Sequence, residues 1–295
     1  MSYLDPKNDL TFKKVFGQHP NLCISLLNSL LPLPGGEYVE EIEYMSSELV
    51  PELPLGKTSI VDVCCKDNKG RQFIVEMQMF WTDSFQYRVV FNASKAFVRQ
   101  LGRGKQYKSL QPVYSLNLVN ENYTQDANEF YHHYKIVNIQ NTNEQLKGLE
   151  FVFIELKKFQ PQNVKEKKMM VLWLRYLTEI NDGTKEVSKD LTDSLEIGQA
   201  LDIIKESAFT EEEIRWYDKY WDIISTERTY LSDSKIEGLI EGKIEGKIEG
   251  KIEGKIEGKV EVAKKLIDKG FGVKEIKELT ELSESEIEKL KRMIK

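Results

Sequence analysis

The chain has 295 residues, of which 31% are charged and 40% hydrophobic, and its formal net charge at pH 7 is −6. This length suits one large domain or two modest ones, and no apolar run approaches the roughly 18 residues that span a bilayer. No signal peptide is visible and the three cysteines have no zinc-binding spacing, so we expect a cytoplasmic protein that has no contact with membranes.

Helix and strand patterns alternate through the first half of the chain. The spacing of apolar residues predicts helices at Asp9–Phe16 and Asn21–Leu31, followed by a strand near Tyr38–Tyr44. After a hairpin, the same patterns predict one more helix and three more strands, at Ser84–Leu101, Val113–Val119, Phe130–Val137 and Leu149–Leu156. This mixture predicts an α/β fold in which helices flank a mixed sheet.

The hairpin is predicted by two short runs, Ser59–Cys65 and Phe73–Met79. We expect a three-residue loop, Asn68–Gly70, in which the glycine takes the left-handed conformation. This loop opposes Asp62 to Glu76 on one face and leaves the other face apolar, with Val61, Val63, Cys65, Phe73, Val75 and Met77. A four-residue loop would oppose Asp62 to Val75 and mix the two faces, so we prefer the first register.

Opposed carboxylates predict a metal site. Directly opposed residues on a hairpin have Cβ atoms about 4.5–5.5 Å apart, where like charges repel unless a proton or a cation intervenes. A hard divalent ion between Asp62 and Glu76 would remove this repulsion, and oxygen ligands suit Mg²⁺, Mn²⁺ or Ca²⁺. The alternative is a slipped register that leaves the two acids on a solvated face of the sheet.

Ordered sequence blocks around this hairpin resemble a known family. The chain is similar to the recombination-promoting nuclease and transposase group of the PD-(D/E)XK nuclease superfamily, in its variant with the pattern D…ExQ. The blocks are Asn8–Gly17, Lys57 to Asp62 with Ile74–Gln78, Tyr87-Arg88 with Gly104–Tyr114, and Phe153–Phe159. The resemblance covers residues 1–160 clearly and 160–230 loosely.

The resemblance implies Mg²⁺-dependent cleavage of DNA by a restriction-endonuclease-like core. By this analogy Asp62 and Glu76 bind the metal, the carbonyl of Met77 adds a ligand, and Asp9 lies in the outer shell. Gln78 stands where the broader superfamily has a lysine. An amide can orient the attacking water but supplies no charge, and the nearest cations on the following helix are Arg88 and Lys95.

A basic helix follows the hairpin. The net negative charge argues against nucleic-acid binding over the whole surface, but residues 84–120 contain no acid. The spacing places apolar side chains inward, with Arg88, Asn92, Lys95 and Arg99 on the other face. We expect phosphate contacts from the six basic residues of this segment, Arg88, Lys95, Arg99, Arg103, Lys105 and Lys108. The alternative is a helix face that is merely solvated.

The rest of the chain is predicted to be helical, and we divide it at residue 230. Residues 1–230 form the nuclease-like domain, and a capping box at Thr210–Glu213 begins its last helix. Residues 231–260 contain six Ile-Glu-Gly units with a period of four, a poor helix alone because each glycine costs about 1 kcal/mol. Residues 261–295 form a small helical module with a second capping box at Ser283–Glu286, which we expect to serve packing or regulation rather than helix-turn-helix DNA reading.

The repeat leaves two interpretations open. A second copy would let the isoleucines at 236–258 bury together, which predicts a homo-oligomer. The alternative is a low-complexity linker. For the whole chain, the sequence favours a metal-dependent DNA endonuclease that acts in recombination or transposition-like transfer. The alternative is a catalytically inactive DNA-binding or self-assembling protein on a nuclease fold.

Overall fold

The computed structural model describes residues 2–49, 59–102, 104, 106–126, 128–161 and 168–294, and it divides into two compact units. Unit 1 is Met1–Ser225 and unit 2 is Thr226–Lys295. Three residues singled out from the sequence, Lys57, Arg103 and Lys105, lie outside the described residues.

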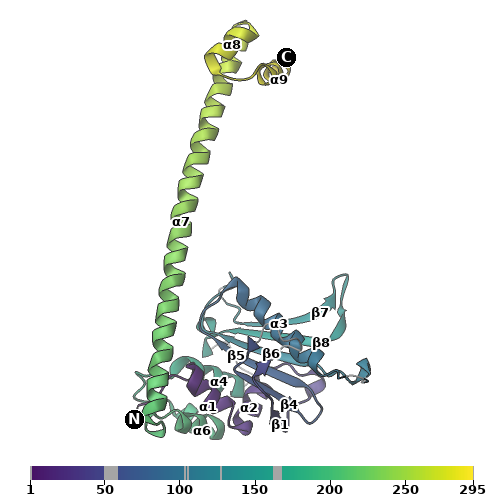
Figure 1. Cartoon of the computed structure of the whole chain (residues 1–295), viewed down its shortest axis with the longest axis vertical. Helices are drawn as coiled ribbons and strands as arrows, with labels where there is room; N and C mark the ends of the chain where they lie inside the picture. The colour runs from purple at the N-terminus through teal and green to yellow at the C-terminus, as the bar shows by residue number, and fades with distance from the viewer. Residues whose placement is uncertain are drawn as a thin grey trace. The chain divides into compact units, whose positions relative to one another are not determined.

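A six-stranded mixed sheet forms the centre of unit 1 (Figure 1). Its strands, in spatial order, are β1 (Ile42–Tyr44), β4 (Val63–Asp67), β5 (Gln72–Gln78), β6 (Val113–Val119), β8 (Asn141–Glu155) and β7 (Tyr131–Asn138). The central strands β5, β6 and β8 are parallel, whereas the outer pairings are antiparallel. The carboxyl ends of the parallel strands therefore meet at one edge, where Gln78 pairs with Val119 and Val119 with Glu155. A separate pair of short strands consists of β2 (Glu48–Leu49) and β3 (Ser59–Ile60).

Helices cover both faces of the sheet, as the sequence predicted. One face packs against α1 (Asp9–Phe16), α2 (Pro20–Leu30), α4 (Lys168–Glu179), α5 (Lys189–Thr192) and α6 (Leu195–Ile203). The opposite face packs against α3 (Asp83–Arg99), which buries Phe85, Val89, Ala93 and Ala96. Short 3₁₀ turns are η1 (Pro34–Gly36), η2 (Tyr107–Ser109), η3 (Leu156–Lys158) and η5 (Glu206–Ala208). The predicted sandwich of helices around a mixed sheet is confirmed.

Several predicted elements are confirmed, but two strands differ in length. The bounds of α1 and β6 are those predicted. Strand β1 is shorter than predicted because the backbone of Val39 bonds with the side chain of Asn28 on α2, at 2.7 and 2.8 Å, instead of with the sheet. Strand β8 begins eight residues earlier than predicted, in a polar segment that pairs with β7 through the backbone.

The predicted hairpin register is confirmed over its central part. Val63 pairs with Val75 and Cys65 with Phe73, and Gly70 has a φ of 81° in the loop. However, the predicted strand Ser59–Cys65 is interrupted at Val61 and Asp62, because its first two residues pair with β2 instead. Val61 consequently packs on the α3 face with Cys64 and Ile74, so its expected place on the Val63 face was wrong.

The repeat segment is helical. Helix α7 (Glu211–Asp268) begins at the predicted capping box, where the Thr210 N–H donates to Glu213 and the Glu213 N–H donates to Thr210. In unit 2 it is followed by α8 (Val273–Thr280) and α9 (Glu284–Ile294). The second predicted capping box, Ser283 with Glu286, is also confirmed. Across the described residues, no helix has an apolar stretch long enough to cross a bilayer.

A small core closes the end of unit 2. Ala263 on α7, Ile276 on α8 and Ile287 on α9 are fully buried, and Leu282 between the last two helices is nearly so. Gly270, with a φ of 83°, allows the chain to turn after α7. Most of the described charged side chains of this unit are exposed.

Candidate active site

Two carboxylates lie next to each other at the carboxyl end of β5. Glu76 is on the strand itself, and Asp62 is at the bend that precedes β4. The Asp62 Oδ2 atom accepts the N–H of Met77 at 2.7 Å, which fixes the Asp62 carboxylate beside the strand. The side chain of Glu76 is 7% exposed and that of Asp62 is 21% exposed. The hairpin thus brings the two predicted acids into one partly open site.

The electrostatics of this pair are unfavourable in the chain alone. Burial raises the pKa of Asp62 to about 6, against the opposing effect of the Met77 hydrogen bond. Burial and the neighbouring charge of Asp62 raise the pKa of Glu76 to about 7. Both shifts mean that the fold does not supply enough compensation for two negative charges.

The first turn of α1 borders the same site. Asn8 caps this helix by accepting the N–H of Leu10 at 3.0 Å, so that Asp9 is the first helical residue. One turn later, the Lys13 Nζ atom lies 2.6 Å from Asp9 Oδ1 and 3.9 Å from Asp62 Oδ1. Asp9 is therefore joined to the acid pair through Lys13.

Gln78 and Arg88 form the opposite border of the site. The Arg88 Nη2 atom donates to Gln78 Oε1 at 2.6 Å and lies 3.9 Å from Glu76 Oε2. The Gln78 Nε2 atom donates to the carbonyl of Phe80 at 2.8 Å, which fixes the orientation of the amide. The guanidinium also lies 5.0 Å from the ring centroid of Phe85. Gln78 therefore holds a cation beside Glu76.

Asn92 completes the surroundings of Glu76. Its Nδ2 atom donates to Glu76 Oε1 at 2.9 Å, and the residue is 1% exposed. The expected place of Asn92 on the exposed basic face of α3 was wrong, because this hydrogen bond and the packing of α3 turn it toward the sheet. A buried amide can bond to a carboxylate without adding charge.

The donor set of the acid pair fits a hard divalent cation. Asp62 and Glu76 offer carboxylate oxygens, and Met77 lies between Glu76 and Gln78 on the partly exposed end of β5. The described part of the chain has no group of three or more histidine, cysteine, aspartate or glutamate side chains that could hold a metal ion, so an ion bound here would need ligands beyond these two carboxylates. Lys13 and Arg88 remain 3.9 Å from the pair, farther than in a direct hydrogen bond.

The predicted phosphate-binding residues are spread along α3 and beyond it. Arg88 is half exposed and lies next to the acid pair, whereas Lys95 lies 5.1 Å from the ring of Phe91. Arg99 ends α3, and Lys108 on η2 lines a hollow with Gly70 and Gln72, at the other end of β5. Among the described residues of this group, only Arg88 lies next to the acids.

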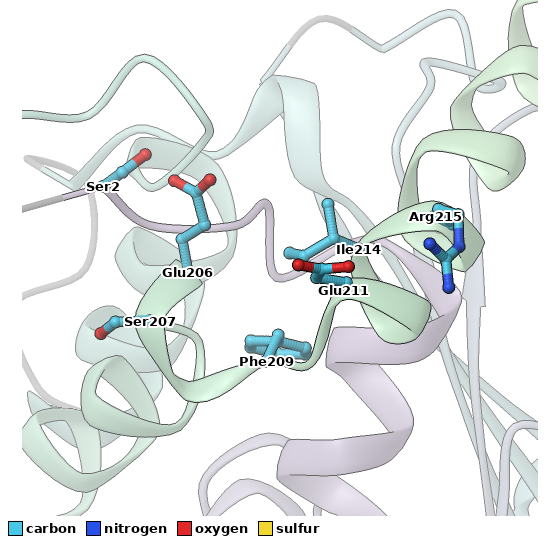
Figure 2. Close-up of a pocket in the computed structure, with 7 residues that line it drawn as sticks. All are labelled: Ser2, Glu206, Ser207, Phe209, Glu211, Ile214 and Arg215. Carbon is cyan, nitrogen blue, oxygen red and sulfur yellow. The ribbon is translucent and has the colours of Figure 1, made fainter.

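A separate hollow of about 600 Å³ lies where the N-terminal segment meets η5 and the start of α7. Ser2 and Glu206 lie at one end of it, and Arg215 lies at the other (Figure 2). None of the predicted site residues lines this hollow. Its side chains show no arrangement that implies a reaction.

Sequence reasoning did not assign Lys13 or Asn92 to the site. The spacing of Lys13, four residues after Asp9, places both on one face of α1 and could have indicated an ion pair. Asn92 lies between inward-facing residues of α3, and a polar residue at such a position often bonds to a buried group.

Comparison with known proteins adds one match. A family model described as PD-(D/E)XK nuclease family transposase matches residues 6–232, which include every side chain of the acid site. Neither curated proteins nor solved structures give a significant match.

Proposed function

The chain belongs to the PD-(D/E)XK nuclease family transposases, and we propose that it is a metal-dependent DNA endonuclease of the cytoplasm that acts in recombination or transposition-like transfer. The observation that carries this proposal is the pair Asp62 and Glu76, a partly buried and a buried carboxylate held side by side with raised pKa values. A protein that only binds DNA has no use for such a pair, because DNA is itself negative.

Asp62 and Glu76 would hold the cation, with the carbonyl of Met77 as a further ligand. Mg²⁺ fits this set of oxygen donors, and Mn²⁺ or Ca²⁺ belongs to the same chemical class. Such an ion polarises a phosphate, lowers the pKa of bound water and neutralises developing charge. In the chain itself, Met77 orients Asp62 and Asn92 orients Glu76, so both carboxylates keep fixed positions.

Arg88 supplies the positive charge that Gln78 lacks. The guanidinium is held by Gln78 and by the ring of Phe85, and it stays half exposed beside Glu76. From this position it can donate two hydrogen bonds to a phosphate, which a lysine cannot do in the same geometry. Lys13, paired with Asp9, places a second cation on the other side of the acids.

The other basic residues would hold the DNA backbone. Lys95 and Arg99 continue along α3 away from Arg88, and Arg103, Lys105 and Lys108 follow in the next segment. Contacts of this kind fix the position of the duplex without reading its sequence. The acid-free composition of residues 84–120 supports this role.

The repeat adds a second element to the proposal. Ile236, Leu239 and Ile240 on α7 are 51%, 66% and 53% exposed, which is unfavourable for large apolar side chains. Association of two copies through 236–258 would bury such a stripe and would bring two active sites to one DNA. Sedimentation of the full chain should show a mass that rises with concentration, and a constant monomer mass would contradict this part.

Cleavage of a supercoiled plasmid in Mg²⁺ tests the enzymatic part. Asp62→Ala and Glu76→Ala should each abolish cleavage, whereas Glu43→Ala, which removes a 72% exposed carboxylate paired with Lys66, should leave it unchanged. Cleavage that survives both site substitutions would contradict the site. Absence of cleavage with any divalent ion would favour the alternative, an inactive DNA-binding or self-assembling protein.

A further inference from the structure

A further pocket, which we name the aromatic pocket, lies beside α3 and has a volume of about 390 Å³. Five aromatic side chains line it: Trp81, Tyr123, Tyr134, Phe151 and Phe153. Gln86 and Lys135 add an amide and an ammonium group, and no acidic side chain among the described residues lines it. Aromatic walls with a few polar groups are typical of sites for flat organic rings.

The walls of this pocket are fixed without a ligand. The Trp81 and Tyr123 rings stack at 3.8 Å with an interplanar angle of 10°. The N–H of Trp81 donates to Glu121 at 2.7 Å, and the N–H of Tyr123 donates to the buried carboxylate of Glu155 at 2.8 Å. Both loops are therefore anchored, so a ring that enters need not order them first.

The aromatic pocket is connected to the acid site by side-chain contacts. Phe85 on α3 lies 5.7 Å from Trp81, ring centroid to ring centroid, and the guanidinium of Arg88 lies 5.0 Å from the same Phe85 ring. Arg88 in turn stands 3.9 Å from Glu76. A ligand held in the pocket would therefore lie only a few nucleotides along a strand from a phosphate at the acid pair.

The charged residues near the aromatic pocket indicate which kind of ligand it can bind. The pocket borders the acid-free segment 84–120, whose α3 contributes Arg88, Lys95 and Arg99. The nearby Glu150 is already paired with His133 at 3.0 Å and with Lys135 at 3.4 Å. A nucleotide of a DNA strand combines a flat, largely apolar ring, which suits the aromatic interior, with a phosphate that Arg88, in contact with Phe85 beside the pocket, can bind.

We propose that the aromatic pocket receives an unpaired nucleobase of the DNA strand whose phosphate lies at the acid pair. A base inside a duplex cannot enter such a pocket, because its faces are covered by its neighbours. The preferred substrate is therefore DNA with an unpaired segment near the cleaved bond, such as a single strand, a frayed end or a hairpin. This inference rests on the proposed DNA binding at the acid site but does not need cleavage.

The test is binding in EDTA, where cleavage does not interfere. Fluorescence anisotropy would compare a labelled 12-nucleotide single strand with a duplex of the same sequence. Tyr134 is 48% exposed, so Tyr134→Ala removes a pocket wall at little risk to folding. It should weaken single-strand binding about 5- to 100-fold, the range of one lost base–aromatic stack, and leave duplex binding unchanged.

Two controls separate stacking from other causes. Tyr134→Phe keeps the ring and should bind like the wild type, and Tyr38→Ala removes a 60% exposed tyrosine outside the pocket and should also have no effect. A series of strands with one abasic site at successive positions should show one position where wild-type binding drops and Tyr134→Ala binding does not.

Equal binding by Tyr134→Ala and Tyr38→Ala would overturn the proposal. So would an equal loss for single strand and duplex, because this would indicate a contact with the backbone rather than with a base. If the plasmid is not cleaved in Mg²⁺ but the single-strand effect is present, the pocket stands and only the enzymatic part of the proposed function fails.

Discussion

Two buried glutamates at the same edge of the sheet differ in how the fold treats their charge. Glu155, at the end of β8, is fully buried and accepts hydrogen bonds from Tyr123, Thr124, His132 and Lys158. Although burial opposes its ionisation, these hydrogen bonds hold the pKa of Glu155 below its usual range. Glu76, at the end of β5, accepts a hydrogen bond from one side chain among the described residues, that of Asn92, and its pKa is raised to about 7.

The hydrogen-bond partners and the pKa of the two glutamates distinguish a structural acid from a candidate metal ligand. Burial alone marks neither, since both side chains are at most 7% exposed. What distinguishes Glu76 is that a second acid, Asp62, is close to it, while Arg88 stays 3.9 Å from Glu76 and Lys13 stays 3.9 Å from Asp62. An arrangement that the chain leaves incomplete is suited to an external cation.

The largest effect on stability should come from a substitution that breaks the hydrogen-bond network around Glu155. Glu155→Gln leaves Lys158, whose side chain is 4% exposed, without its carboxylate partner. Breaking a buried pair in this way costs about 3–5 kcal/mol in the free energy of unfolding. Urea unfolding would measure the loss, and Glu43→Gln at the exposed pair with Lys66 is the control. A change below that of the control would remove the distinction between the two glutamates.

The acid pair should make the metal-free chain less stable as pH rises. In EDTA, the folded-state pKa values of about 6 for Asp62 and about 7 for Glu76 exceed the ordinary values of 3.8 and 4.5. The folded chain then binds more protons than the unfolded chain between these limits, so the free energy of unfolding falls as pH rises from about 4 to 7. The loss is about 3 kcal/mol per group.

Urea unfolding at pH 5 and pH 8 would show this slope. Glu76→Gln should flatten the slope and stabilise the metal-free chain at pH 8, because it removes one of the two repelling charges. Equal slopes for the wild type and Glu76→Gln between pH 5 and pH 8 in EDTA would contradict the raised pKa values of the pair.

Arg88→Ala tests whether the cation beside Glu76 contributes to cleavage. Loss of the guanidinium should lower the rate of plasmid cleavage about 10- to 100-fold, the range typical of groups that support a metal site. Gln78→Ala should have a smaller effect, and in the Arg88→Ala background it should add little, since the two side chains act through one contact. Additive losses would show that Gln78 acts on its own.

The smallest expected effect is at the far end of β5. Lys108→Ala should weaken DNA binding equally for all sequences and reduce the salt dependence of binding by about one phosphate contact. Anisotropy over a series of salt concentrations would measure both. A loss that depends on the DNA sequence would contradict a role in backbone contact.

Much of this organisation could be predicted from the sequence, because local signals were strong. The capping box of α7, the Asn68–Gly70 turn and the largely apolar β6 each have a clear pattern. The bend at Asp62 could not be predicted, since it depends on the pairing of Ser59 and Ile60 with β2 and on the N–H of Met77, which donates to Asp62.

Tertiary contacts also decided the parts of the site that the sequence left open. Gln78 could be recognised as a position without charge, but the choice of Arg88 over Lys95 follows from the way α3 packs on the sheet. Lys13 reaches Asp62 only because α1 lies beside the hairpin. Such contacts between elements are not encoded in local periodicity.

Titration calorimetry with Mn²⁺ at pH 8 is the most direct test of whether Asp62 and Glu76 together bind a divalent cation. Wild-type protein should bind one ion per chain, and the isosteric double variant Asp62→Asn, Glu76→Gln should bind none, while Glu155→Gln should retain the site if it stays folded. Equal binding by the wild type and the double variant would contradict the account.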